Sequence, residues 1–308
     1  MLPILLKTLP FFALIGTGYL AGRSRFFPPE GVAWLTKFVF FFALSAMLFR
    51  FAANLSLSDI FDLPFVLAYL TASSLLYALV MAISRLRGRS VEEAAMEAQC
   101  AQSGNTGFLG VPMLVVLLGP QAAGPVLMVL TVDMVVFSSL ITLIITGARG
   151  GALGLHTAKA LAMGWLKNPM VVSIVLGLIW SGAALPVPGP VNEYLAILGA
   201  AATPGALFAI GASLAGRGLT RLPDAVWLSF AKLVLHPALC AIAAFWLFPV
   251  EPVAAGVMVA AASLPVAGNV YILAQHYGVA PQRVSTAILI STAASILTVT
   301  TIIAWITG

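Results

Sequence analysis

Charged residues are scarce in this chain. Only 8% of its 308 residues are Asp, Glu, Lys or Arg, while 61% are hydrophobic and the mean hydropathy is +1.07. This composition excludes two soluble domains, because so few polar side chains cannot cover a globule in water. Lipid must be the solvent for most of the surface, and we expect an all-α integral membrane protein.

Cysteine is also scarce, and the usual signatures of catalysis are missing. The two cysteines, Cys100 and Cys240, fall inside apolar runs, which favours buried thiols over a disulfide framework. The sequence contains no HExxH, GxxxxGK[ST] or GxSxG motif and no Cys/His cluster with metal-ligand spacing. We therefore expect no cofactor, no metal site and no enzymatic activity.

The apolar runs are long enough to be membrane spans. A spanning helix needs about 20 residues, so the chain has room for about ten. Charged residues, glycines and prolines divide the sequence into ten predicted helices, at residues 4–22, 32–52, 61–84, 91–118, 122–147, 160–182, 191–215, 223–248, 252–277 and 283–306.

The basic residues support this division. They occur singly or in small groups and form no stripe, which argues against nucleic acid as a partner. Eleven lie in one set of alternate connections, against Lys7 and Arg50 in the other set. The positive-inside rule makes the first set cytoplasmic and predicts a protein of the cytoplasmic membrane with both termini outside, in the periplasm. The eleven are Arg23, Arg25, Arg85, Arg87, Arg89, Arg149, Lys159, Lys167, Arg217, Arg221 and Arg283.

Two predicted helices are interrupted by similar segments. SGNTGFLGVP occupies residues 103–112 and SLPVAGN occupies residues 263–269, so that Asn105 and Asn269 are 164 residues apart, about half the chain. The same offset pairs the first helix with the sixth and the second with the seventh. We expect two five-helix halves, residues 1–150 and 151–308. Because five is odd, the second half enters the membrane from the opposite side, which makes an inverted repeat.

These interruptions predict a binding site. Glycine and proline free backbone groups whose exposure to hydrocarbon costs several kcal/mol, so each break must face protein or a water-filled cavity. If the breaks cross in mid-membrane, the positive N-terminal ends of the following half-helices attract an anion there, and asparagine amides both donate and accept. The alternative is a pair of kinked helices. The predicted substrate-binding residues are Asn105, Asn269, Gly104, Thr106, Gly107, Pro112, Pro265 and Gly268.

Three ionisable residues inside predicted spans require an explanation, since each costs about 2.5–3.5 kcal/mol to insert. Asp133 lies in mid-span in LTVDMVV and predicts a proton- or ion-coupling site, unless hydroxyl or backbone groups merely cap it. Lys232 either pairs with a carboxylate of the protein or substrate, or snorkels to the cytoplasmic face. Glu97 is expected to belong to a solvated helix start.

Three segments resemble the auxin efflux carrier family, which includes the plant PIN carriers and bacterial dicarboxylate (malate and malonate) permeases. They are AQSGNTGFLGVPML (Ala101 to Leu114), TPGALFAIGASLAG (Thr203 to Gly216) and SLPVAGNVYILAQHYG (Ser263 to Gly278). The resemblance covers essentially the whole chain. It implies ten helices in two inverted repeats, crossing helices 4 and 9, and carriage of organic carboxylates.

The wider architecture is similar to that of bile-acid sodium symporters and sodium/proton antiporters. This similarity implies a scaffold of helices 1, 2, 6 and 7 and a moving core of helices 3–5 and 8–10. The short segment from Gly147 to Lys167 between helices 5 and 6 indicates a prokaryotic member and argues against auxin as the substrate.

The sequence therefore predicts a secondary transporter of small organic anions that works by alternating access in a lipid bilayer. A proton or sodium ion is the expected coupling ion, and the apolar scaffold helices 2 and 7 offer a homodimer face. Two alternatives remain open. One is a cation/proton exchanger that uses Asp133 and Lys232, and the other is a ligand-binding membrane sensor that signals through a separate partner chain.

Overall fold

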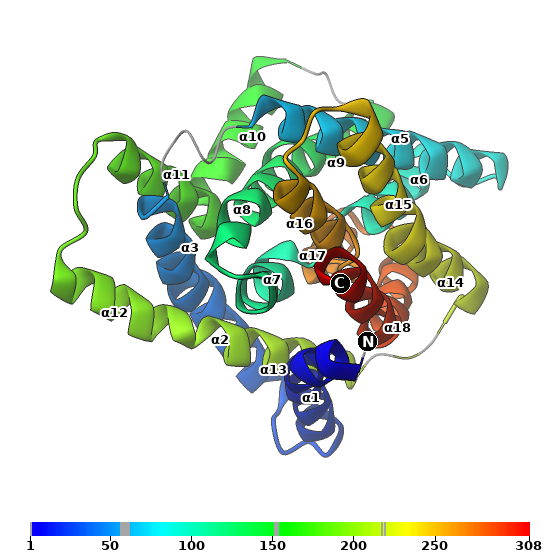
Figure 1. Ribbon diagram of the computed structural model, residues 1–308. Helices are drawn as coiled ribbons and strands as arrows, with labels where there is room; N and C mark the ends of the chain where they lie inside the picture. Colours follow the sequence, from blue (N-terminus) through cyan, green and yellow to red (C-terminus); the bar gives the residue numbers. More distant parts are fainter. Residues whose placement is uncertain (1, 56–61, 151–153, 217, 219) are drawn as a thin grey trace.

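The computed structural model describes residues 2–55, 62–150, 154–216, 218 and 220–308; Arg217 lies outside this part. All regular elements of the described residues are helical, which confirms the all-α prediction (Figure 1). In the first half they are α1 (Leu2–Arg23), α2 (Pro29–Phe38), η1 (Val39–Ala43), α3 (Leu44–Ala53), α5 (Leu63–Leu86), α6 (Val91–Gln102), η2 (Thr106–Gly110), α7 (Val111–Leu118), η3 (Pro120–Ala122), α8 (Ala123–Val132), η4 (Asp133–Phe137) and α9 (Ser138–Ala148).

The second half repeats this helical character. Its elements are α10 (Leu155–Lys167), α11 (Pro169–Gly182), α12 (Gly189–Ala200), α13 (Ala202–Leu214), α14 (Leu222–Phe230), η5 (Ala231–Leu235), α15 (His236–Ile242), η6 (Ala243–Leu247), α16 (Pro252–Ala262), α17 (Gly268–Tyr277) and α18 (Pro281–Thr307). Among the described residues, seven helices are long and apolar enough to cross a membrane, or eight if the bent pair of α10 and α11 counts as one span.

The predicted helix at residues 160–182 is wrong at its start. The structure has two helices there, α10 and α11, bent by 75° relative to each other. Pro169 disfavours helical backbone at the preceding Asn168, and the Asn168 Oδ1 atom accepts a hydrogen bond from Met170 N at 3.0 Å. Asn168 therefore begins a new helix in the N-cap position.

Both predicted breaks are present, and the kinked-helix alternative is wrong. Residues 103–105 separate α6 from η2, and residues 263–267 separate α16 from α17. The backbone is extended at Ser103 and at Ala267. We call α6 and α16 the first half-helices, and η2 with α7, and α17, the second half-helices. Pro112 lies in the first turn of α7, and the π-helical turn η2 precedes it.

Close backbone packing joins the two halves. α1 packs along α13, and α3 packs along α11. A Cβ atom on Gly18 would collide with the carbonyl oxygen of Phe208, and one on Gly177 would lie 2.8 Å from the carbonyl oxygen of Phe49. Glycine at these points lets the helices approach each other closely, as is common in membrane proteins.

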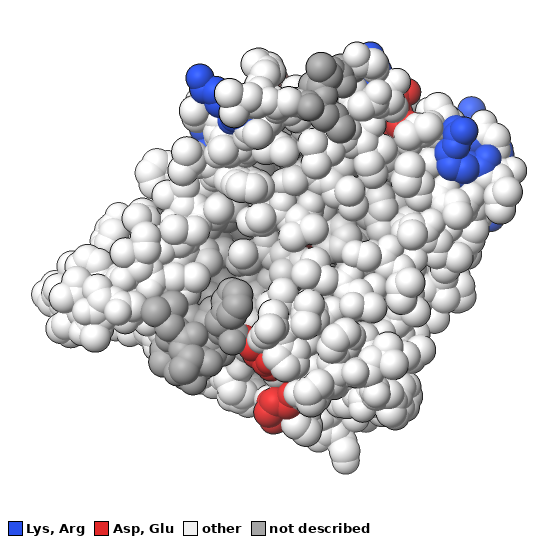
Figure 2. Space-filling view, turned by 90° about the horizontal axis from the view of Figure 1, so that it is seen from above, with Lys and Arg blue, Asp and Glu red and all other residues white. Residues whose placement is uncertain are grey.

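Polar contacts join the segments that connect the helices at two ends of the molecule. At one end, ion pairs of Arg89, Arg149 and Arg283 link the start of α6 with the connections before α14 and after α9 and α17. At the other end, Arg50 after α3 bonds to Asn192 of α12. Figure 2 shows Lys and Arg gathered toward one edge and a group of Asp and Glu at the opposite edge, with a broad uncharged belt between them. This arrangement agrees with the alternation of the predicted connections.

Candidate functional site

The two breaks contact each other directly. Asn105 N donates to Pro265 O at 2.8 Å, Ala267 N donates to Ser103 O at 3.0 Å, and Gly104 and Val266 form an antiparallel bridge. The backbone groups that one break frees are thus satisfied by the other, as burial in a membrane protein demands. We call these two segments, residues 103–105 and 263–267, the crossing.

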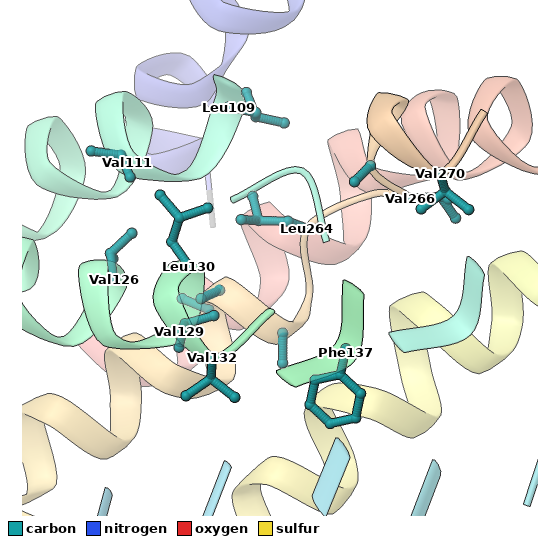
Figure 3. Packing of buried hydrophobic residues seen from close by; sticks show 14 of the residues in the cluster. Leu109, Val111, Val126, Val129, Leu130, Val132, Phe137, Leu264, Val266 and Val270 are labelled. Atoms are coloured by element: carbon teal, nitrogen blue, oxygen red, sulfur yellow. The ribbon is translucent and has the colours of Figure 1, made fainter. Parts of the chain in front are cut away.

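The glycines of the first break leave room for side chains that pack against it. A Cβ atom on Gly104 would lie 3.1 Å from the Lys232 Nζ atom, one on Gly110 would lie 2.5 Å from Leu264 Cδ1, and one on Gly107 would collide with Met170 Cε. Figure 3 shows Leu264 and Val266 among other buried apolar side chains, including Leu109 and Leu130. Apolar side chains therefore pack against Leu264 and Val266 of the crossing, while Lys232 lies against Gly104.

A cavity of about 90 Å³ lies at the crossing, and we call it the central cavity. It brings together six of the predicted site residues, while Thr106, Pro112, Pro265 and Lys232 do not line it. Its lining consists of Phe40, Ser103, Gly104, Asn105, Gly107, Phe108, Leu130, Asp133, Met134, Ser138, Asn168, Met170, Ala267, Gly268 and Asn269. Both asparagines and Asp133 thus face one small space.

Both second half-helices begin at this cavity. η2 starts at Thr106 and α17 starts at Gly268. The first N–H groups of a helix have no carbonyl oxygen of a preceding turn as hydrogen-bond acceptor, and the helix dipole makes that end positive. Two such ends beside two amide side chains form an environment that favours a carboxylate or another small anion.

Asp133 presents one oxygen atom to the protein and keeps the other without a partner. Its Oδ1 atom accepts from Tyr69 Oη at 2.8 Å and from Gln102 Nε2 at 2.6 Å. Its Oδ2 atom is buried and has no hydrogen-bond partner among the described residues. The capping alternative therefore accounts for only half of the carboxylate, and the other half is available to a proton, a cation or a polar ligand.

Lys232 joins the ends of the two first half-helices. Its Nζ atom donates to Gln102 O at 3.1 Å and to Ala262 O at 2.8 Å, the last carbonyls of α6 and α16. It also lies 2.7 Å from His236 Nδ1. The side chain is fully buried, so the snorkelling alternative is wrong. A cation stabilises the negative C-terminal ends of helices, so Lys232 offsets those ends and leaves the positive ends to face the cavity.

Several residues around the central cavity escaped the sequence analysis. Gln102, a polar residue just before the first break, was a detectable signal. Tyr69 and Asn168 were not, because only the fold brings them to Asp133 and the cavity. The rings of Phe40 and Phe108 stack at 6.2 Å between their centroids and form one wall. In the described part of the chain, no group of three or more His, Cys, Asp or Glu residues is placed to hold a metal ion.

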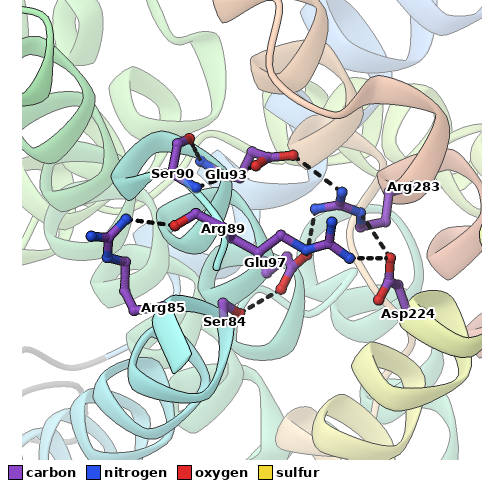
Figure 4. Close-up of polar contacts among 8 residues, drawn as sticks. All are labelled: Ser84, Arg85, Arg89, Ser90, Glu93, Glu97, Asp224 and Arg283. Carbon is purple, nitrogen blue, oxygen red and sulfur yellow. Dashed lines mark hydrogen bonds and ion pairs between the residues drawn. The ribbon is translucent and has the colours of Figure 1, made fainter. Parts of the chain in front are cut away.

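The expectation for Glu97 is wrong. This carboxylate is buried, and Figure 4 shows that it accepts from Ser84 Oγ and from Arg283. Arg283 also lies 3.1 Å from Glu93 and 3.3 Å from Asp224, atom to atom. Arginine pairing makes such burial tolerable. We call these residues and Arg89 the ion network; none of them lines a described cavity.

Comparisons with known proteins identify the family of the chain. The family described as "Membrane transport protein" matches residues 3–303. The "Putative malonate transporter" of Rhizobium meliloti (strain 1021) is 33% identical over 299 residues, which cover 95% of this chain and 92% of that relative.

Proposed function

Because the chain belongs to the membrane transport protein family, in agreement with its resemblance to auxin efflux carriers, we propose that it carries small organic carboxylates by alternating access. It is a membrane transporter and not an enzyme. Malonate, which the relative's name gives, is the first substrate to test. The observation that carries the proposal is the crossing, where two helix N-terminal ends and two asparagines meet at one cavity.

The substrate carboxylate is bound by Asn105, Asn269 and the first N–H groups of the second half-helices. Gly104, Gly107 and Gly268 keep this backbone accessible, while Thr106, Pro112 and Pro265 shape the half-helices and the crossing. A cavity of about 90 Å³ is far below the roughly 300–1,000 Å³ of sites for drug-sized ligands. This difference favours a substrate of few atoms over a bulky aromatic acid.

The full architecture is ten spans in two inverted five-helix repeats, residues 1–150 and 151–308. In such a repeat, helix 1 corresponds to helix 6 and helix 7 corresponds to helix 2, so a contact between helices 1 and 7 should be matched by one between helices 6 and 2. Both pairs pack closely in the structure, as α1 on α13 and as α11 on α3. Helices 1, 2, 6 and 7 form the scaffold, and the others form a core that moves against it. Exposed Trp34, Phe38 and Phe42 on helix 2 supply an apolar face for a homodimer.

The protein lies in the cytoplasmic membrane with both termini outside. The support is the end of the molecule that carries the ion network, where the arginine-rich connections meet. The short apolar stretches Thr106–Leu118 and Pro252–Ala262 complete spans 4 and 9 together with their other half-helices.

Asp133 couples transport to protons by taking up and releasing one. The positive charge of Lys232 stabilises the ends of α6 and α16 at the crossing while it does so. The support is the Asp133 Oδ2 atom, which is buried without a partner beside the substrate site. The same atom favours one second candidate, a cation/proton exchanger of the same fold. A cation would then occupy the central cavity in place of a carboxylate.

Transport by purified protein in liposomes separates these candidates. The panel consists of malonate with other mono- and dicarboxylates, each measured with and without an imposed proton or sodium gradient. Carboxylate uptake that a proton gradient accelerates is the expected result. Cation exchange without uptake of any carboxylate would overturn the proposal in favour of the second candidate.

A further inference from the structure

Another cavity, with a mostly apolar lining, lies at the end of the molecule opposite the ion network. It measures about 280 Å³, and we call it the outer cavity. The end of α3 forms one side, and the turn between α7 and α8 forms the other. Of the four described cavities, this is the one with a basic side chain, Arg50, in its lining. The other lining residues are Phe51, Asn54, Leu55, Val115, Pro120 and Ala123.

Arg50 is oriented by a neutral side chain and forms no ion pair among the described residues. Its Nε atom donates to the amide oxygen of Asn192 at 3.0 Å. No described carboxylate lies within the 4.0 Å of an ion pair, although Arg89, Arg149 and Arg283 all have one. The two terminal nitrogens of Arg50 have no hydrogen-bond acceptor among the described residues. A half-buried guanidinium group is thus held by a neutral partner, and its fork has no acceptor among the residues that the structure describes.

The same two helices line the outer cavity and the central cavity. The continuous helix Pro29–Ala53 supplies Phe40 to the central cavity and Arg50 to the outer one. The helix Thr106–Leu118 likewise supplies Phe108 to the first and Val115 to the second. At about 1.5 Å per residue, the two cavities are roughly 10–15 Å apart along these helices. The stacked rings of Phe40 and Phe108 join these two helices at the central cavity.

We propose that Arg50 and the outer cavity form a second carboxylate subsite, which binds the anion from the outer solution before it reaches the crossing. The inference rests on the proposed function. The free fork of an arginine matches a carboxylate in bidentate geometry, and an uncompensated positive charge beside the entry path raises the local concentration of an anion. The tether to Asn192 lowers the entropy that the guanidinium group loses on binding.

Initial rates of malonate uptake test this subsite. The variants are Arg50→Gln, Arg50→Lys and Asn192→Ala, in proteoliposomes of phosphatidylethanolamine and phosphatidylglycerol. Loss of one charge-assisted bidentate contact is expected to raise the KM of Arg50→Gln about tenfold with little change in the maximal rate. Arg50→Lys should show a smaller increase, because it keeps the charge and loses the fork. Raised ionic strength should increase the KM of the wild type and leave that of Arg50→Gln nearly unchanged.

Lys7→Gln is the matched control, because it removes an exposed positive charge that lines none of the four described cavities. Its KM should equal that of the wild type. A wild-type KM in Arg50→Gln overturns the inference and leaves the proposed function intact. If Arg50→Gln fails to fold, wild-type KM values in both Arg50→Lys and Asn192→Ala overturn the inference instead.

The headgroup of a lipid with net negative charge, here phosphatidylglycerol, shares this chemistry and is an alternative source of the anion. The measurement is therefore repeated in liposomes of pure phosphatidylcholine, which carries no net charge. A tenfold effect of Arg50→Gln that persists there supports the soluble carboxylate, whereas an effect that disappears assigns Arg50 to an anionic lipid and overturns the inference. A wild-type protein that transports no carboxylate would overturn the proposed function itself, and the subsite with it.

Discussion

Two buried polar clusters of this protein differ in how completely their groups are paired. In the ion network, Arg283 and Arg89 both have carboxylate partners, Glu97 and Asp224, although the Nε atom of each arginine makes no hydrogen bond among the described residues. No described cavity reaches these charges. At the crossing, one oxygen of Asp133 has no described partner, and two helices begin at a cavity. Paired charges hold helices together, whereas unpaired groups beside a cavity are available to a ligand. Within one core, the ion network therefore stabilises the structure, and the groups at the crossing are available for function.

The unpaired groups have a cost. A buried polar atom without a hydrogen bond costs about 1–3 kcal/mol, and a membrane protein has little water nearby to reduce that cost. Such an arrangement is expected where a ligand or proton completes it for part of the transport cycle. Mutations in the two clusters should consequently affect different quantities: stability in the ion network, and transport at the crossing.

The largest expected effect on stability comes from Glu97→Gln. The change leaves Arg283 buried with one carboxylate fewer, so the free energy of unfolding should fall by about 3 kcal/mol. The KM for malonate in the folded protein should not change. Thermal unfolding in detergent and uptake in liposomes measure the two quantities. Glu92→Gln is the control, because the more exposed Glu92–Arg149 pair should contribute less than about 1 kcal/mol. A raised KM with unchanged stability would contradict the comparison.

Asp133→Asn should produce the opposite pattern. The amide has nearly the same shape and can still accept at Oδ1, so the free energy of unfolding should change by no more than about 1 kcal/mol. The neutral side chain can no longer take up and release a proton, and uptake should become insensitive to an imposed pH gradient. Malonate uptake at matched internal and external pH, and then with an acidic exterior, measures this. Gradient-driven uptake that survives the change would exclude Asp133 as the coupling residue.

A smaller effect is expected from Gly107→Ala. The added methyl group would collide with Met170, which lines the same cavity, so the substrate space should shrink. The KM for malonate should rise about fivefold, which corresponds to roughly 1 kcal/mol. Gly147→Ala is a matched control, since a Cβ atom there meets nothing within 4 Å. Equal KM values in both variants would show that the central cavity does not hold the substrate.

The sequence predicted the breaks but not how they join. Glycine, proline and asparagine interrupt two apolar runs, and this local signal indicated where α6 and α16 end. The antiparallel contact between Gly104 and Val266 depends on segments far apart in the chain. For the same reason, nothing local could show that Asp133 lies beside Tyr69, or that Glu97 meets Arg283 across 186 residues. A charged residue near the start of a helix is predicted from the sequence to be solvated, because its distant partner cannot be seen there.

The start of the sixth helix shows a different limit. The apolar run around residues 160–182 is long enough for one span, and hydrophobicity alone does not show a bend. The Asn168–Pro169 pair was the available signal, because proline restrains the residue before it and asparagine caps helices. Its consequence for the site, a place for Asn168 in the lining of the central cavity, required the fold.

The most direct test of the account is the binding of malonate to purified protein by titration calorimetry, in the wild type, Asn105→Ala and Gln282→Ala. Alanine keeps the backbone bonds of Asn105 to Pro265, so the variant should fold with a wild-type melting temperature. We expect binding to be lost in Asn105→Ala and retained in Gln282→Ala, whose amide side chain is exposed and lines none of the four described cavities. Wild-type affinity for malonate in Asn105→Ala would contradict the assignment of the crossing as the carboxylate site.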